Sequence, residues 1–184
     1  MAPEPSWPPD AIFTLGHSTL PSEQFVALLH GYGIERLADI RTIPRSRHNP
    51  QFNADELAES LPAAGIAYVP MPALGGLRHA RKDSPNSAWR NKSFRGYADY
   101  MQTDEFAAAV AELVAGAESG RTAIMCAEAV PWRCHRSLVA DALEARGVPA
   151  VEIMSATNAR RHVLTSFARV DGKRVSYPPE EQTS

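Results

Sequence analysis

The sequence predicts an α/β fold in three layers, with a mostly parallel five-stranded sheet and helices on both of its faces. Short apolar runs alternate along the chain with longer segments in which apolar residues recur at helical spacing. Strands that are covered on both faces have such continuous apolar runs, and helical crossovers between them produce a parallel sheet. With 184 residues, of which 44% are hydrophobic and 22% charged, the chain has the composition of a globular protein with a sizeable core.

Five short apolar runs are the expected strands, and most are flanked by the glycine, proline or charged residues that end regular structure. They are residues 12–15, 37–40, 66–69, 122–125 and 150–153. The expected helices run from Pro21 to Gly31 or Gly33, and over 53–65, 94–101, 103–117 and 135–146. Asn53 with Glu56 resembles a capping box and Thr103 is an N-cap, whereas Pro62 should shorten its helix.

No internal repeat or long linker divides the chain, so we expect a single α/β domain over residues 11–170. The proline-rich segment 1–10 and the tail 171–184 are expected to be loose. No stretch approaches the ~18 uncharged apolar residues that a membrane span needs. Residues 1–9 have neither the basic start nor the apolar run of a signal peptide. These features favour a cytoplasmic protein without a membrane partner.

Polar and reactive residues follow four of the expected strands, at the edge where open α/β sheets bind their ligands. Arginine is a good bidentate partner for phosphate and carboxylate, and segment 41–95 holds nine Lys and Arg against four Asp and Glu. An anionic ligand would suit this edge, although any single arginine can also be an ordinary solvated side chain. The expected substrate-binding residues are His17, Ser18, Asp39, Arg41, Arg45, Arg47, Gly75, Gly76 and Arg136.

The segment 126–136 joins a buried strand to a helix and carries the most reactive side chains. Cys126 and Glu128 follow the end of the strand, and Cys134 and His135 lie at the start of the helix. A helix N-terminus favours anions and therefore thiolates. Either cysteine is thus a candidate catalytic nucleophile, with Glu128 or His135 as the general acid or base.

Three other interpretations of the same residues stay open. Both cysteines can be small buried residues without chemistry. Cys126, Cys134, His135 and His17 offer four zinc ligands, but adjacent Cys and His is not a usual zinc spacing. A redox disulfide between Cys126 and Cys134 lacks the Cys-x-x-Cys spacing of thioredoxin-like motifs. We therefore assign no metal ligand, and no motif identifies a cofactor.

Several stretches together resemble the family catalogued as domain of unknown function number 488. The resemblance implies an α/β fold in which these residues line one site, and it implies no particular activity. The stretches are 14–18, 39–41, 44–47, 50–52, 74–76, 94–97, 100–101, 126–128 and 134–136.

We interpret the chain as an enzyme for an anionic, phosphate- or nucleotide-bearing substrate, such as a cysteine-dependent hydrolase or transferase. One alternative is a nucleic-acid-binding or nucleic-acid-processing-associated module. It would use segment 78–95, in which six Lys and Arg face one acid, with Trp89 and Phe94 interleaved. The other alternative is a protein that binds metal through its Cys and His side chains. The sequence indicates no oligomeric state.

Overall fold

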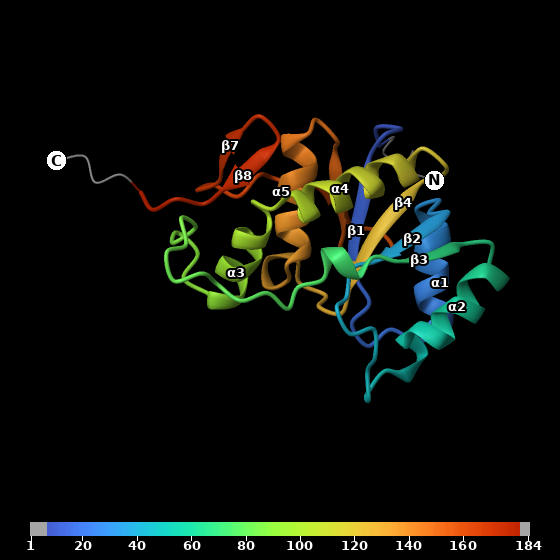
Figure 1. Ribbon diagram of the computed structural model, residues 1–184. Coiled ribbons are helices and arrows are strands. Elements are labelled where there is room, and N and C mark those ends of the chain that lie inside the picture. Colours follow the sequence, from blue (N-terminus) through green and yellow to red (C-terminus); the bar gives the residue numbers. More distant parts are fainter. Residues whose placement is uncertain (1–6, 181–184) are drawn as a thin grey trace.

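The computed structural model describes residues 7–180, which form an α/β fold around a central sheet (Figure 1). Residues 1–6 and 181–184, which belong to the two expected loose ends, lie outside the described residues. The short 3-10 helices are η1 (Pro50–Phe52), η2 (Pro72–Leu74) and η3 (Pro131–Arg133). The other elements are β1 (Ile12–Gly16), α1 (Ser22–Gly31), β2 (Arg36–Asp39), α2 (Ala54–Ala63), β3 (Ala67–Pro70), α3 (Lys92–Tyr100), α4 (Asp104–Ala117), β4 (Thr122–Cys126), α5 (Arg136–Ala145), β5 (Ala150–Ile153), β6 (Ala159–Arg161), β7 (Arg169–Asp171) and β8 (Arg174–Ser176).

The main sheet has the strand order β3-β2-β4-β1-β5-β6. The strands from β3 to β5 in this order pair in parallel, and β6 pairs antiparallel with β5 at one edge. The α/β class and the mostly parallel sheet are confirmed, whereas the expected number of five strands is wrong because the sheet is six-stranded and mixed. The sixth strand has no apolar run: two of its three residues are exposed arginines, Arg160 and Arg161.

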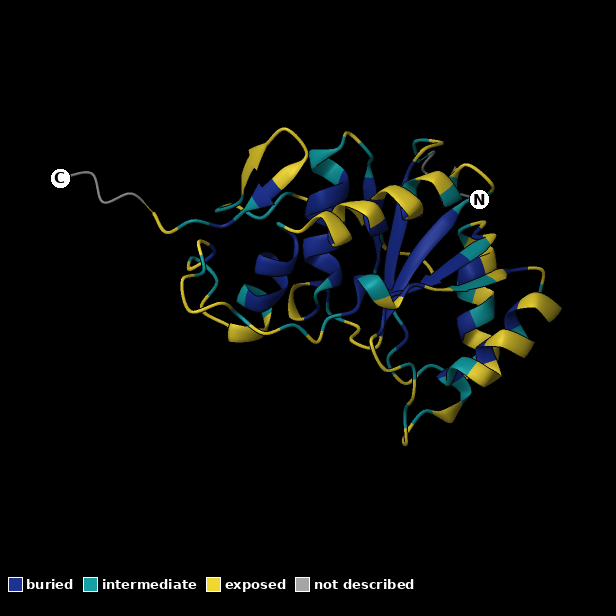
Figure 2. Cartoon of the chain, viewed as in Figure 1, coloured by how far each residue is buried: buried dark blue, intermediate teal, exposed yellow. Residues whose placement is uncertain are grey.

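Helices cover both faces of this sheet. On one face α1 and α2 pack against it, and Phe25 and Leu57 belong to the same core cluster as Phe13 of β1. On the other face α3, α4 and α5 pack together, and Tyr97 belongs to the same core cluster as Ile12. Figure 2 shows the central strands buried and the outer helix surfaces exposed. None of the helices within residues 7–180 has the length and apolar character required to cross a bilayer.

The helix ends follow the expected signals in part. Thr103 caps α4, and its side chain accepts a hydrogen bond from the backbone N–H of Phe106. The chain enters α2 at Asn53, but its side-chain oxygen accepts from the backbone N–H of Ser46 at 2.7 Å instead of capping the helix. Asn53 therefore fastens the loop that follows β2. α2 ends one residue after Pro62.

The C-terminal region is packed as far as Tyr177. β7 and β8 form an antiparallel hairpin, after which Tyr177 is fully buried. Its hydroxyl donates to Oδ2 of Asp141 in α5 at 2.7 Å. The expectation of a loose tail from residue 171 is therefore wrong for residues 174–177, because Val175 and Tyr177 belong to the core on the α5 side of the sheet.

A buried histidine links this region to the sheet. His162 lies between Asp141 and Glu152, with Nε2 2.7 Å from the first carboxylate and Nδ1 2.8 Å from the second. All three residues are buried. Burial alone would lower the pKa of His162, but the hydrogen bonds and charges of the two carboxylates outweigh it and raise the pKa to about 9. His162 is therefore a cation at neutral pH.

We expect His162→Leu to lower the free energy of unfolding by about 3–5 kcal/mol, because buried Asp141 loses its cation and Glu152 keeps only its ion pair with the half-exposed Arg160. The pKa of His162 is raised above the ~6.5 of an unfolded chain. The ion pair therefore stabilises the fold fully below about pH 6.5, and this stabilisation is lost as the pH rises through about 9. Urea unfolding of both proteins across this pH range measures the difference.

The matched control is Val163→Ala, since Val163 is 82% exposed and its loss should change stability by no more than about 0.5 kcal/mol. A difference between the wild type and His162→Leu that stays constant up to high pH would contradict the ion-pair account.

Candidate functional site

A cleft of about 450 Å³ lies at the carboxyl ends of β1, β2 and β4. These strands are neighbours in the sheet, with Gly16 paired to Cys126 and Asp39 paired to Met125. The loops that follow them consequently meet at one edge. The cleft is lined by His17, Arg41, Thr42, Ile43, Arg45, Ser46, Gly76, Leu77, Ser93, Phe94, Cys126, Ala127, Glu128, Arg133, Cys134 and His135.

Arg41 is held by nearly all of its donors. Nε and Nη2 donate to the two carboxylate oxygens of Asp39 at 2.9 and 2.7 Å, and Nη2 also donates to the carbonyl of Phe52. Nη1 lies 3.4 Å from Nε2 of His17. The hydroxyl of Tyr68 donates to Asp39 and fixes it in turn. Because a single N–H group remains for a ligand, Arg41 contributes mainly a fixed positive charge.

His17 is oriented by three neighbours. Its ring stacks on Phe52 with the centroids 4.1 Å apart, and Nδ1 donates to the carbonyl of Ser18 at 2.8 Å. Since a carbonyl only accepts, the lone pair lies on Nε2 and faces Arg41. Burial, supported by the charge of Arg41, lowers the pKa of His17. The ring is therefore a neutral acceptor at neutral pH, and Ser18 contributes its carbonyl to this arrangement.

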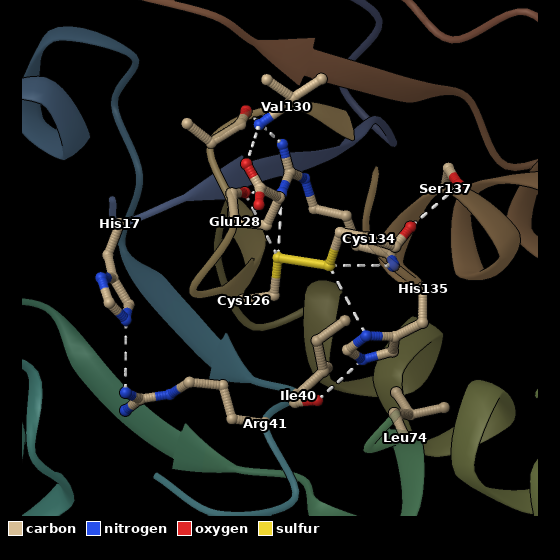
Figure 3. Close-up of a disulfide and its surroundings, with 12 residues drawn as sticks. His17, Ile40, Arg41, Leu74, Cys126, Glu128, Val130, Cys134, His135 and Ser137 are labelled. Carbon is tan, nitrogen blue, oxygen red and sulfur yellow. Dashed lines mark hydrogen bonds between the residues drawn. A yellow bond between two sulfur atoms is a disulfide. The ribbon is translucent and has the colours of Figure 1, made fainter. Parts of the chain in front are cut away.

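The two cysteines meet at the back of the cleft (Figure 3). Cys126 ends β4, Cys134 lies just before α5, and a disulfide joins their Sγ atoms. Nη1 of Arg136 donates to Sγ of Cys126 at 2.9 Å. Sγ of Cys134 instead lies 3.5 Å from the backbone N of Arg136 and 3.5 Å from Nδ1 of His135. One sulfur thus faces a guanidinium, and the other faces a helix N-terminus and an imidazole.

Arg136 is 1% exposed, and no carboxylate within residues 7–180 lies at ion-pair distance from it. It donates to the carbonyls of Glu128 and Ala129, which holds the loop after β4 against α5. Burial lowers the pKa of Arg136 to about 10, so it stays charged at neutral pH. A buried charge without a counter-ion is costly, and in the reduced protein Sγ of Cys126 would be the group in contact that is able to carry a negative charge.

His135 presents a neutral ring nitrogen to Cys134, which could accept a hydrogen bond from the thiol of the reduced protein. Its Nε2 donates to the carbonyl of Ile40 at 3.0 Å, so the lone pair lies on Nδ1, which faces Sγ of Cys134. Burial lowers the pKa of His135 to about 4. Gly76 packs on the ring, and a Cβ added there would lie 2.6 Å from Nδ1. A side chain at this position would therefore displace the imidazole.

The mouth of the cleft combines exposed cations with apolar side chains. Arg45 and Arg133 are both exposed, and neither guanidinium has a hydrogen-bond partner in the described part of the chain. Ile43 and Leu77 are 62% and 68% exposed. This arrangement suits a ligand that has an anionic group beside an apolar part.

Five of the expected site residues do not line the cleft: Ser18, Asp39, Arg47, Gly75 and Arg136. Asp39 and Arg136 act from behind it, through Arg41 and Cys126. A Cβ at Gly75 would overlap the side chain of Thr42, so this glycine serves the packing of the loop.

Some of the lining residues were not expected from the sequence. Ile43 and Leu77 are apolar residues in polar, glycine- and proline-rich loops, which was the available signal for them. Phe94 was named only in the nucleic-acid alternative, and it lies at the start of α3, where it is partly buried and reaches the cleft. Arg133 was treated only as part of a segment, and it lies in η3, next to Cys134.

Residues 21–143 match the family model described as Domain of unknown function DUF488. The chain belongs to this family. No curated protein and no solved structure matches the chain. The DUF488 match includes β2, β4 and the start of α5, whereas β1 and His17 precede it. Membership brings no activity with it, so the chemistry has to be argued from the cleft.

The geometry offers little support for the two alternative interpretations, a metal-binding site and a nucleic-acid-binding module. Within residues 7–180, no three side chains of His, Cys, Asp and Glu are grouped so that they could hold a metal ion. Trp89, expected to stack on a nucleic-acid base, instead makes edge-on contacts with Phe94, Phe167 and Tyr177. Its ring is thus engaged in the protein's own packing.

We expect Asp39→Asn to lower the free energy of unfolding by about 3 kcal/mol, because buried Arg41 loses its ion-pair partner. Tyr68→Phe removes one hydrogen bond to the same carboxylate and should cost about 1 kcal/mol. Chemical denaturation of the two variants measures both values. Equal losses in the two variants would show that Asp39 does not hold Arg41 through its charge.

Proposed function

We propose that the cleft is the active site of a cysteine-dependent enzyme, a hydrolase or transferase, that acts on an anionic, phosphate- or nucleotide-bearing substrate. The reduced chain carries the nucleophile on Cys126, at the end of β4 and in the lining of the cleft. Glu128 also lines the cleft and is exposed, so it is the general acid or base.

The observation that carries this proposal is the buried guanidinium of Arg136. It is charged at neutral pH, it lacks a carboxylate partner within residues 7–180, and it donates to Sγ of Cys126 at 2.9 Å. A thiolate at Cys126 supplies the missing negative charge. Positive neighbours of this kind activate cysteines as nucleophiles, because the thiolate is the reactive form.

The substrate side of the cleft supports an anionic ligand. Arg45 and Arg133 are exposed cations from two different segments, and Arg41 adds a fixed charge to the same cleft. Arginine binds phosphate oxygens through charge-assisted hydrogen bonds. Ile43 and Leu77 supply an apolar surface for the remainder of the substrate, such as a nucleotide base.

We expect Cys126 of the reduced protein to react with iodoacetamide faster than Cys134 at neutral pH. Arg136 favours the thiolate of Cys126, whereas the proton of Cys134 is shared with His135. The alkylation rate of Cys126 should reach half its maximum below the ~8.5 of free cysteine. Mass spectrometry of each cysteine against pH gives both profiles. If both cysteines follow the profile of free cysteine, the proposal that Cys126 is an activated nucleophile is contradicted.

Inorganic pyrophosphate and adenosine monophosphate, used as probes, should slow the alkylation of Cys126. The double variant Arg45→Gln with Arg133→Gln should weaken this protection about tenfold, because it removes the two exposed cations of the cleft. Arg90→Gln removes an exposed cation that does not line the cleft and serves as the matched control. If the probes protect Cys126 equally well in the double variant, Arg45 and Arg133 do not bind the anion and this part of the proposal is contradicted.

A further inference from the structure

We infer that the cleft also reduces small anionic disulfides, with Cys126 as the attacking thiol and Cys134 as the resolving thiol. This activity rests on the proposed nucleophile at Cys126 and adds a second thiol to it. The net reaction transfers two electrons from the two cysteines to the substrate. It differs from hydrolysis or group transfer, in which Cys134 has no chemical part.

The first support is the meeting of the two sulfur atoms. Cys126 and Cys134 come from different elements, the end of β4 and the turn after η3, and their Sγ atoms are bonded in the cleft. Both cysteines line the same cavity, so an adduct on Cys126 would form beside the second thiol. A positioned neighbouring group reacts far faster than a second molecule from solution.

The second support is the difference between the two sulfur environments. Sγ of Cys126 accepts from the buried guanidinium of Arg136, which favours the thiolate needed for attack. Sγ of Cys134 faces the lone pair of Nδ1 of His135, which can accept the proton of a thiol. A reactive thiolate beside a protonated thiol with its own acceptor is the arrangement that a two-step exchange requires.

The steps balance as a thiol–disulfide exchange. The thiolate of Cys126 attacks one sulfur of the substrate R–S–S–R, a mixed disulfide forms on Cys126, and R–S⁻ leaves with the electron pair of the broken bond. The thiol of Cys134, which donates a hydrogen bond to Nδ1 of His135, then gives up its proton and attacks Sγ of Cys126. The internal disulfide forms, the second R–S⁻ leaves, and the proton passes on to a leaving thiolate or to solvent. A small thiol reductant restores both cysteines by the reverse exchange and becomes oxidised itself.

The cleft also specifies the charge of the substrate. Arg45 and Arg133 present cations at its mouth, next to the exposed apolar side chains of Ile43 and Leu77. Disulfides that carry carboxylates close to an apolar or aromatic part fit this surface. Neutral disulfides meet the same cysteines without the electrostatic attraction.

The probe is 5,5′-dithiobis(2-nitrobenzoate), an aromatic disulfide with two carboxylates, added in slight excess to the reduced protein. The wild type should release about two thionitrobenzoate anions per chain and finish with the Cys126–Cys134 disulfide. Cys134→Ser should release about one and retain a mixed disulfide on Cys126, seen as an added mass on that peptide. Cys126→Ser should react much more slowly, because the remaining thiol, Cys134, is protonated at neutral pH.

The neutral 2-hydroxyethyl disulfide tests the charge preference. The double variant Arg45→Gln with Arg133→Gln should slow the anionic probe about tenfold and slow the neutral disulfide much less. Arg90→Gln should leave both rates unchanged. Equal slowing of both disulfides in the double variant would overturn the assignment of an anionic substrate.

The outcomes separate this inference from the proposed function. If Cys126 is the fast thiol but the wild type keeps two separate mixed disulfides and forms no internal bond, Cys134 is not a resolving thiol and the nucleophile stands. If Cys134 is the fast thiol in alkylation and in exchange, both the proposed nucleophile and this inference fail.

Discussion

The candidate site depends on one buried charge, the guanidinium of Arg136. It anchors the loop after β4 through two carbonyl oxygens and contacts Sγ of Cys126, while its own backbone N–H points to Sγ of Cys134. One residue at the start of α5 therefore contacts both cysteines, Cys126 through its side chain and Cys134 through its backbone, and holds the loop between them. No carboxylate within residues 7–180 pairs with this guanidinium. In our proposal, a thiolate at Cys126 therefore both acts as the nucleophile and stabilises the buried charge of Arg136.

A second buried pair, Asp39 with Arg41, shapes the opposite wall of the cleft. In both cases a side chain that does not line the cleft contacts one that does: Arg136 contacts Cys126, and Asp39 contacts Arg41. The two imidazoles are also fixed as neutral acceptors, since each donates one ring N–H to a backbone carbonyl and burial lowers the pKa of both His17 and His135. The polar groups of the cleft are thus preorganised before any ligand arrives.

The sequence predicted the five parallel strands closely because each is a short, mainly apolar run. It also predicted that polar side chains gather at the carboxyl ends of these strands, where several of them line the cleft. It missed β6, β7 and β8, which are short and largely exposed. It also could not separate residues that line the cleft from those that support it. Both Arg136 and Arg45 are arginines near reactive residues in the sequence, and only the structure shows that Arg136 is buried against Cys126 whereas Arg45 is exposed.

The most direct test of the central claim is the ultraviolet absorbance of the thiolate against pH in Cys134→Ser, where Cys126 is the single cysteine. The account predicts a titration below the ~8.5 of free cysteine, which Arg136→Met moves to higher pH and Arg146→Met, a substitution at the other end of the same helix, does not. A titration near ~8.5 that is the same with and without Arg136 would contradict the pairing of Arg136 with a Cys126 thiolate.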